Sequence, residues 1–260
     1  MKTIYTMGID VGSTASKCII LRDGKDIAAK SLVGVGAGTS GPARAISEVL
    51  EAAGMQRADM DFVLATGYGR NSLEEIADSQ MSELSCHAKG AHFLFPDVHT
   101  VIDIGGQDTK AIGLAGGKVR KFVMNDKCSA GTGRFLEIMA DRLGVSQVEL
   151  ARLAAAGQPT VISSMCTVFA ESEVISLVGK GEPRENIARG VIDSVVARVC
   201  TLVGQVPAAR YHLTGGLCEN DYVRARLEAE LGAPVGSCPD ARFAGALGAA
   251  IIAAELEGAA

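Results

Sequence analysis

The chain has 260 residues, which is enough for one large domain or for two lobes with their own cores. A net charge of −5 without a Lys/Arg-rich block argues against nucleic acid as the main partner. The longest apolar run, Ala244 to Ala254, is too short to span a bilayer, and a strand pattern starts at Ile4 with no room for a signal peptide. We therefore expect a soluble, cytoplasmic protein that does not bind membranes.

The first half of the chain predicts strands followed by helices. Short apolar runs are separated by a glycine turn at Gly12 and by an Asp-Gly hairpin signal at Asp23. Pro42 and the apolar spacing behind it predict a helix. The predicted elements are a strand to Val11, strands over Lys17–Leu21 and Ile27–Leu32, a helix over Pro42–Ala53, a strand over Phe62–Thr66 and a helix from Ser72 to about Ala91.

The second half repeats this order and then becomes helical. A Gly-Gly hairpin at Gly116 takes the place of the Asp-Gly hairpin. The predicted elements are strands over Thr100–Ile104, Lys110–Leu114 and Val119–Met124, helices over Arg134–Leu143, Gln147–Ala155, Thr167–Val178 and Arg184–Val203, a strand over Tyr211–Leu213, and helices over Asn220–Leu231 and Ala244–Leu256. Strands followed by helices, twice, predict an α/β protein of two similar lobes.

Two segments of the chain have nearly the same sequence, 93 positions apart. The segment from Ile9 to Lys17 and the segment from Ile102 to Lys110 share an Asp, a Gly and a Lys at the same offset. A duplicated unit of this kind predicts two lobes that face one another across a cleft, each with one carboxylate and one glycine turn. The ligand that suits two such turns is the phosphate chain of a nucleotide with its magnesium.

The residue types in these segments suit Mg²⁺ and phosphate. Asp10 and Asp103 end their strands just before the turns, where a carboxylate can hold Mg²⁺ directly or through water, and with Gln107 they are the candidate catalytic residues. Glycine lets backbone N–H groups approach phosphate oxygens, and a Thr-Gly-Gly after a later strand suits an adenine-ribose face. The candidate nucleotide-binding residues are Gly12, Ser13, Thr14, Ala15, Ser16, Lys17, Gly105, Gly106, Gln107, Ala130, Gly131, Thr132, Gly133, Gly215, Gly216 and Arg242.

The order of the three motifs Asp-x-Gly-Ser-Thr, Asp-Ile-Gly-Gly-Gln and Thr-Gly-Gly resembles that of the actin, Hsp70 and sugar-kinase superfamily. The resemblance spans the chain and implies an α/β fold of two RNase H-like (actin-like ATPase) lobes that close on ATP. We expect lobe I at residues 1–97, with the C-terminal helix at about 244–260 packing back on it. We expect lobe II at residues 98–243.

Two of the seven cysteines lie in distinctive settings. Cys128 lies in a Gly/Ser loop that enters a helix, and Cys166 lies near a helix start that Ser164 or Thr167 could cap. Helix N-termini stabilise thiolates and any anionic cluster bound to them. Two such cysteines from each of two chains could complete a four-thiolate iron–sulfur site on the axis of a homodimer. On the residues alone, two structural or incidental thiols stay the favoured interpretation.

The flanking sequences resemble one family closely. The stretches Asn-Asp-Lys-Cys-Ser-Ala-Gly-Thr-Gly-Arg-Phe (125–135), Cys-Thr-Val-Phe-Ala-Glu-Ser-Glu-Val (166–174) and Ala-Thr-Gly-Tyr-Gly-Arg (65–70) resemble the activators (component A) of 2-hydroxyacyl-CoA dehydratases. The resemblance implies an oxygen-sensitive homodimer with one bridging [4Fe–4S] cluster, held by Cys128 and Cys166 of both subunits. It also implies transfer of one electron, driven by hydrolysis of Mg-ATP to ADP, from ferredoxin or flavodoxin to the dehydratase (component D).

Two other functions fit the nucleotide motifs. A small-molecule kinase would need a carboxylate base, for which Glu171, Asp108 and Asp126 are candidates by position. An actin-like scaffold would use the nucleotide to switch partners. A kinase leaves the cysteine pair unexplained, so bound iron distinguishes the activator from it. Assembly without iron or redox activity favours the scaffold.

Overall fold

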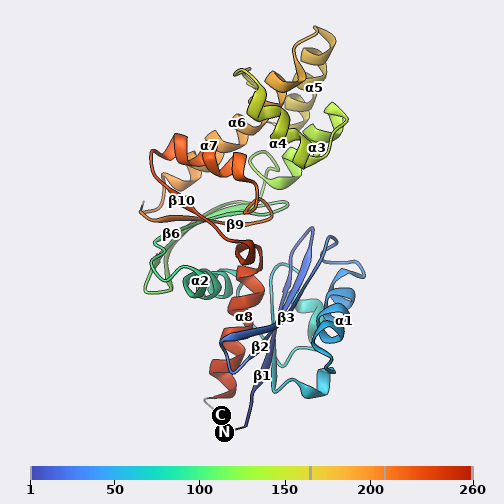
Figure 1. Cartoon of the computed structure of the whole chain (residues 1–260), viewed down its shortest axis with the longest axis vertical. Helices are drawn as coiled ribbons and strands as arrows, with labels where there is room; N and C mark the ends of the chain where they lie inside the picture. The colour runs from blue at the N-terminus through green and yellow to red at the C-terminus, as the bar shows by residue number, and fades with distance from the viewer. Residues whose placement is uncertain (1, 164–165, 208, 259–260) are drawn as a thin grey trace. The chain divides into compact units, whose positions relative to one another are not determined.

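The computed structural model describes residues 2–163, 166–207 and 209–258 (Figure 1). The chain divides into two units, one formed by Met1–Val98, Leu114–Arg120 and Asp240–Ala260 and the other by His99–Gly113 and Lys121–Pro239. Each of the two sheets has five strands, parallel and antiparallel, with helices packed around them. The α/β class with two similar halves is therefore confirmed. No helix within the described ranges is long and apolar enough to cross a membrane.

The first sheet has the strand order β3-β2-β1-β4-β5. Strand β1 pairs antiparallel with β2 and parallel with β4, so that β1 and β4 end at the same edge of the sheet. The β2–β3 hairpin turns at Asp23 and Gly24, whose φ angles of 52° and 68° are those of a type I′ turn. The strand bounds are β1 Tyr5–Val11, β2 Ser16–Arg22, β3 Asp26–Val33, β4 Phe62–Thr66 and β5 Ser79–Gln80.

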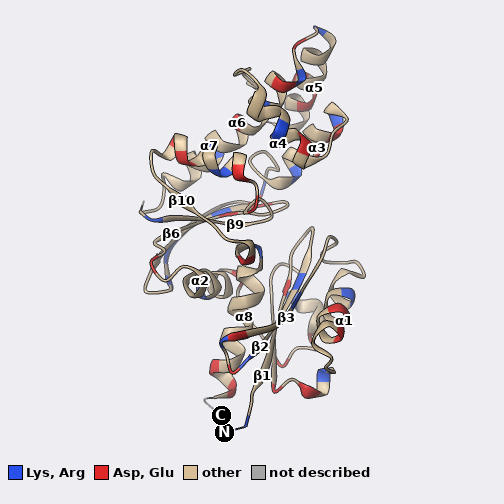
Figure 2. Cartoon of the chain, viewed as in Figure 1, with Lys and Arg blue, Asp and Glu red and all other residues tan. Residues whose placement is uncertain are grey.

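Helices cover both faces of the first sheet. Helix α8 lies against β1 so closely that a Cβ on Gly8 would come within 2.0 Å of the Ala246 carbonyl oxygen. Its sequence is apolar until the two glutamates near its C-terminal end, and Figure 2 shows that α8 carries charged side chains only there. The bounds are α1 Gly41–Ala53, α2 Glu83–Leu94 and α8 Ala244–Glu257, with short 3₁₀ turns at Arg57–Asp59, Arg70–Leu73 and Pro239–Phe243. Because β1 is central and α8 crosses it, the end of β1 and the start of α8 meet.

The second sheet has the strand order β10-β9-β6-β7-β8, and β6 again pairs antiparallel with the next strand and parallel with a later one. The β7–β8 hairpin turns at Gly116 and Gly117, with φ angles of 56° and 71°. The bounds are β6 Thr100–Ile104, β7 Thr109–Ala115, β8 Lys118–Asn125, β9 Tyr211–Gly215, β10 Val235–Gly236, α3 Gly133–Leu143, α4 Gln147–Ala156, α5 Thr167–Gly179, α6 Arg184–Val203 and α7 Asp221–Leu231.

The helix predicted from Ser72 to about Ala91 is wrong in its first half. The chain instead makes a 3₁₀ turn and the short strand β5, and α2 starts only after Ser82. The Asp78 carboxylate accepts the backbone N–H of Val63 at 2.7 Å, which holds this segment against β4. Ser82 then caps α2 by accepting the N–H of Ser85. A local helical pattern is overridden here by pairing to the sheet.

Candidate functional site

Both glycine turns are closed by the same backbone hydrogen bond. In the first turn the N–H of Gly12 donates to the carbonyl of Ala15 at 3.0 Å, and in the second the N–H of Gly105 donates to the carbonyl of Asp108 at 2.9 Å. Donor and acceptor thus recur at the offset of the two sequence motifs. The duplication extends from sequence to backbone geometry.

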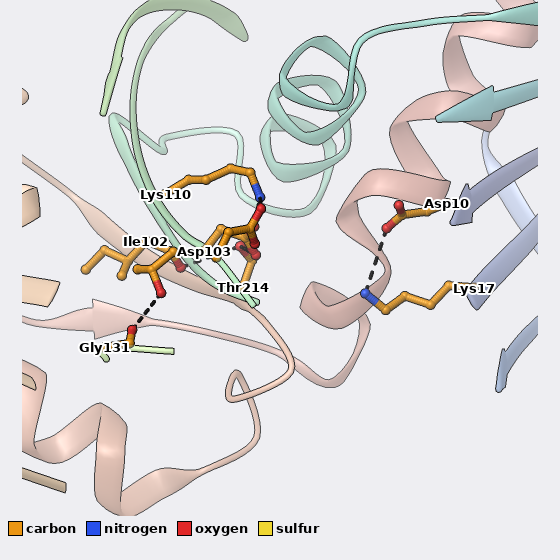
Figure 3. Close-up of polar contacts among 9 residues, drawn as sticks. Asp10, Lys17, Ile102, Asp103, Lys110, Gly131 and Thr214 are labelled. Carbon is orange, nitrogen blue, oxygen red and sulfur yellow. Dashed lines mark hydrogen bonds and ion pairs between the residues drawn. The ribbon is translucent and has the colours of Figure 1, made fainter. Parts of the chain in front are cut away.

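Asp10 lies at the end of β1 and is 8% exposed. Its β2 neighbour Lys17 approaches it with 3.8 Å between Nζ and Oδ2 (Figure 3). A Cβ on Gly67 would lie 2.5 Å from Oδ1, and one on Gly245 would lie 2.7 Å from Oδ2. The absence of side chains at these two glycines keeps space beside both carboxylate oxygens.

Asp103 has the same surroundings in the second unit. Lys110 on β7 places Nζ 3.4 Å from its Oδ2 and 2.8 Å from Oδ2 of Asp108 (Figure 3). The Thr214 hydroxyl donates to Oδ1 at 3.2 Å. A Cβ on Gly215, whose φ is +81°, would lie 2.6 Å from Oδ1. A carboxylate, a lysine on the next strand and a glycine with positive φ therefore recur in both halves.

The sequence reasoning missed part of this arrangement. Thr66 on β4 is the neighbour of Asp10 in the sheet register, and Thr214 on β9 is the neighbour of Asp103. Each threonine is followed by a glycine with positive φ. The sequence motifs predict only the second Thr-Gly as part of the nucleotide-binding site, and they do not predict Lys110. The signal was present, because Thr-Gly directly follows a short apolar strand in both halves.

Several predicted nucleotide contacts are used inside the fold. The buried Ser16 hydroxyl donates to the Val35 carbonyl at 3.0 Å, and the buried Thr132 hydroxyl donates to the Ser129 carbonyl at 2.6 Å. The N–H of Gly216 donates to the Ile104 carbonyl at 3.0 Å. These groups support the turns. Ser13, Thr14 and Ala15 lie half-buried in the first turn, Gln107 is exposed in the second, and Arg242 lies in the 3₁₀ turn before α8.

The two cysteine segments lie side by side. Cys128 and Cys166 are both exposed, and their chain neighbours Ser129 and Thr167 share a hydrogen bond of 2.8 Å between hydroxyl oxygens. Cys166 is the N-cap residue of α5, and Thr167 is the first residue of that helix. Ser164, the other predicted cap, lies outside the described residues.

The loop that contains Cys128 is shaped by Asn125 at the end of β8. The amide nitrogen of Asn125 donates to the carbonyls of Cys128 and Ala130, at 3.0 and 2.9 Å. Cys128 therefore lies in an ordered turn five residues before α3 begins, and only Cys166 occupies a helix N-terminus.

The same loop is bonded to the second glycine turn. The N–H groups of Gly133 and Arg134, at the start of α3, donate to the carbonyls of Gly105 and Gly106 at 2.9 and 2.8 Å. The buried Thr109 hydroxyl, at the start of β7, donates to the carbonyl of Gly131 at 2.7 Å. The turn that follows Asp103 thus shares two hydrogen bonds with the start of α3, and the first residue of β7 shares one with the loop that contains Cys128.

The other cysteines are less suited to bind metal. Cys18, Cys86 and Cys218 are buried, and Cys200 and Cys238 are half-buried. Burial raises the pKa of Cys86 and of Cys200 to about 11, and that of Cys18 further, so these thiols stay protonated at neutral pH. Within the described ranges no three His, Cys, Asp or Glu side chains gather as a metal site.

Two of the carboxylates considered as kinase bases are bound by cations. Glu171 on α5 pairs with Arg142 on α3 at 2.5 Å, and Asp108 pairs with Lys110 at 2.8 Å. Asp126 is exposed in the cysteine loop. The Glu171–Arg142 pair ties together the helix that follows the Cys128 loop and the helix that Cys166 caps.

Comparison with known proteins gives one consistent result. Residues 7–253 match the model of the BadF/BadG/BcrA/BcrD ATPase family. The (R)-2-hydroxyglutaryl-CoA dehydratase activating ATPase of Acidaminococcus fermentans is 60% identical over 96% of this chain and 97% of its own length. These matches confirm the resemblance found in the sequence.

Solved structures agree with the sequence comparison. The activator of the 2-hydroxyisocaproyl-CoA dehydratase from Clostridium difficile, solved with bound ADPNP, has a TM-score of 0.94 and 42% identity, and covers 98% of this chain and 96% of that chain. A ROK family glucokinase from Streptomyces griseus has a TM-score of 0.62 at 15% identity, covering 96% and 99%. The similarity to the glucokinase concerns the fold alone. This fold is the one that the three superfamily motifs imply.

Proposed function

The chain belongs to the BadF/BadG/BcrA/BcrD ATPase family, and from that premise we propose that it activates a 2-hydroxyacyl-CoA dehydratase by ATP-dependent transfer of one electron. The high identity to a dehydratase-activating ATPase over nearly the full length supports the activity. The observation that carries the mechanism is the set of three hydrogen bonds that join the turn after Asp103 and the start of β7 to the start of α3 and the Cys128 loop.

The two glycine turns serve ATP hydrolysis in this proposal. Asp10 and Asp103 act on the magnesium of one bound nucleotide, directly or through its waters, because hard oxygen ligands suit Mg²⁺. The glycines beside each carboxylate leave space for an ion and its waters. Lys17 and Lys110 neutralise the carboxylates when magnesium is absent, and they are positioned to turn toward phosphate when magnesium arrives. Gln107, exposed in its turn, is the proposed group that orients the attacking water.

Cys128 and Cys166 fit an iron–sulfur cluster by their chemistry and exposure. Both thiols reach solvent, and their segments are joined by the Ser129–Thr167 hydrogen bond. A [4Fe–4S] cluster takes four thiolates and supplies, when bound, a one-electron carrier. The N-terminus of α5 beside Cys166 favours the anionic form of such a site. One chain offers two suitable thiols, so a second copy supplies the other two.

The surface of α5 supports this homodimer. Only Ala170 and Val174 of the helix are buried, whereas Val168 and Phe169 are 65% and 68% exposed, and Ile175 is 54% exposed. Apolar side chains in a row on a helix that starts at a cluster ligand are typical of a protein interface. We propose that the same residues of a second copy cover this face and bring the four cysteines together.

Coupling between nucleotide and cluster follows from the shared hydrogen bonds. A change in the Gly105–Gly106 turn on ATP binding moves the carbonyls to which the first N–H groups of α3 donate. Thr109 passes the same change to Gly131, and the Arg142–Glu171 pair passes it from α3 to α5. A ligand can shift an equilibrium only by its differential affinity for the two states, and these bonds connect the turn that would sense the nucleotide to the cysteine segments.

The partners of the proposed activity are the dehydratase, which receives the electron, and ferredoxin or flavodoxin, which replaces it. The similar activators serve different acyl groups, 2-hydroxyglutaryl in one and 2-hydroxyisocaproyl in another. This difference is understandable, because the acyl-CoA binds to the dehydratase and the activator supplies only the electron.

Iron analysis of the anaerobically purified protein tests the proposal. We expect about four iron and four sulfide per two chains. Cys128→Ser and Cys166→Ser each remove two of the four ligands and should abolish iron binding. Cys18→Ser and Cys200→Ser are the controls and should leave the iron content unchanged. Four iron per chain, or full iron in the Cys166 variant, would contradict the assignment.

A further inference from the structure

An exposed basic segment leads directly into the Cys128 loop. Residues 118–127, which comprise β8 and the two residues after it, contain four cations and one Asp in a chain whose net charge is −5. All five charged side chains are exposed. Four cations in ten residues are too sparse to stand out in the sequence, but β8 places three of them on one edge of the sheet, and the fourth follows two residues after the strand. The cations are Lys118, Arg120, Lys121 and Lys127.

The four cations of this segment are not paired with acidic side chains of the described residues. Across residues 2–163, 166–207 and 209–258, their side chains form no hydrogen bond or ion pair, a state shared only by Lys25 and Lys180. Most other Lys and Arg side chains are paired, as Arg142 is with Glu171. Unpaired, clustered charge of one sign creates a local potential that attracts the opposite sign.

The duplicated strand of the first unit provides an internal comparison. Strand β3 holds the same place at the edge of its sheet, but its two charges cancel and are paired, Asp26 with Arg22 and Lys30 with Asp240. A single lysine is a common way to protect an edge strand from aggregation. Protection of the edge therefore accounts for β3 and does not account for the unpaired cations of β8.

Strand β8 is also more accessible than its counterpart. In β3, alternate residues are buried against α1, whereas no residue of β8 is buried. Phe122 and Met124 are 46% and 38% exposed, on the strand face that also carries Arg120. Apolar side chains within a charged rim are the usual composition of a protein interface, in which Phe, Met and Arg are enriched.

From this surface we infer that β8 and Lys127 form the docking site of an acidic protein that carries one electron. The inference rests on the proposed function, in which each electron given to the dehydratase must be replaced by an external one-electron carrier. The carrier is oxidised by one electron as the cluster of the activator is reduced by one, and no proton is transferred. The site ends at Cys128, where that electron must arrive. Charge complementarity of this kind raises the association rate and orients the partner.

A pair of double charge reversals tests the docking site. Arg120→Glu/Lys127→Glu changes the basic segment, and Lys25→Glu/Lys180→Glu makes the same change of charge at exposed, unpaired lysines elsewhere. The dissociation constant for an acidic two-cluster ferredoxin is measured anaerobically for both variants, at about 20 and about 200 mM salt. We expect the first variant to bind about tenfold more weakly or worse at low salt, and the two variants to converge at high salt.

Reduction by dithionite separates this inference from the proposed function. Because dithionite is a small reductant that needs no docking, it should reduce the cluster to the same final extent in both variants. Equal ferredoxin binding by the two variants, with normal dithionite reduction, overturns the docking site alone. Loss of binding to the dehydratase with unchanged ferredoxin binding also overturns it, because the occupant is then the dehydratase. A wild-type protein without iron overturns the proposed function and the inference with it.

Discussion

Asp10 and Asp103 are nearly buried, and each lies beside a lysine and a glycine with positive φ. A buried carboxylate is costly unless it is paired, and each pair with lysine meets that need in the absence of magnesium. The arrangement resembles a site in which a magnesium ion takes the place of the lysine ammonium group beside the carboxylate. In this interpretation the carboxylates of Asp10 and Asp103 have the same role toward magnesium.

The first prediction concerns the carboxylates themselves. Asp10→Asn and Asp103→Asn each keep the size of the side chain but remove the charge that holds magnesium, so ATP hydrolysis should fall by about two orders of magnitude or more. Iron content should not change, because iron is held by thiolates. Steady-state ATPase rates with iron analysis of the same samples measure both effects. Unchanged hydrolysis in both variants would remove these residues from the mechanism.

The second prediction concerns the space beside Asp10. Gly67→Ala would place a Cβ 2.5 Å from Oδ1 at a φ of +87°, so the carboxylate must move and the ATPase rate should drop about tenfold or more. Gly54→Ala is the matched control, because Gly54 also has a positive φ of 65° but open space around its Cβ. Gly54→Ala should lose about 1 kcal/mol of stability from backbone strain, and Gly67→Ala should lose more, because its Cβ would also lie 2.6 Å from the Val11 carbonyl oxygen. Equal ATPase rates in the two would show that the space beside Asp10 is not required.

At the residue scale, the sequence predicted the carboxylates and the glycine turns because the duplication made them visible. It missed Thr66, Gly67 and Lys110, because parallel pairing between distant strands decides what lies beside a carboxylate. It also assigned Ser16 to the nucleotide, whereas the hydroxyl is bonded to Val35. Hydrogen bonds to a backbone carbonyl leave no pattern in a single sequence.

At the scale of elements, β7, α3 and α5 connect the Gly105–Gly106 turn to both cysteine segments. Strand β7 begins with Thr109, α3 begins with the N–H groups bonded to the turn, and α5 begins after Cys166. Each connection is made at the end of an element, where backbone groups are not used by the element itself. The hydroxyl of Thr109 is a connection that a conservative substitution can remove.

Thr109→Val should weaken the coupling while leaving the fold intact. The substitution removes the hydrogen bond to Gly131 at a cost of about 1 kcal/mol and keeps the side-chain shape. Alkylation of Cys128 in cluster-free protein should depend on nucleotide in the wild type and depend on it much less in the variant. Thr100→Val is the control, because Thr100 is equally buried and donates to the Pro207 carbonyl at the same 2.7 Å. An equal nucleotide dependence in all three proteins would refute the role of Thr109.

The order and bounds of most elements follow from the sequence, and the failures share a cause. The segment from Ser72 to Met81 has a helical pattern, yet its residues Ser79 and Gln80 pair with β4 as strand β5. Strand β10, at Val235–Gly236, was not predicted because it has two residues and forms only beside β9. Short edge strands depend on a partner that is distant in the chain, so local periodicity cannot reveal them.

In the whole molecule, the two halves have the same core arrangement, but the second half contains further elements. Both have a carboxylate, a lysine and a glycine turn, but only the second has the cysteine segments and the basic strand β8. The family match and the activator structures agree with this assignment of a shared ATPase plan. The central claim is that nucleotide bound at the duplicated turns changes the environment of Cys128 and Cys166.

The rate at which a chelator removes iron from the dimer tests this claim most directly. The rate is measured anaerobically on one preparation without nucleotide, with ADP and with a non-hydrolysable ATP analogue. Because the cysteine loop is bonded to the Gly105–Gly106 turn, we predict rates that differ among the three states, with the analogue and ADP well separated. Identical rates in all three states would contradict the account and leave an ATPase and an iron site without coupling in one chain.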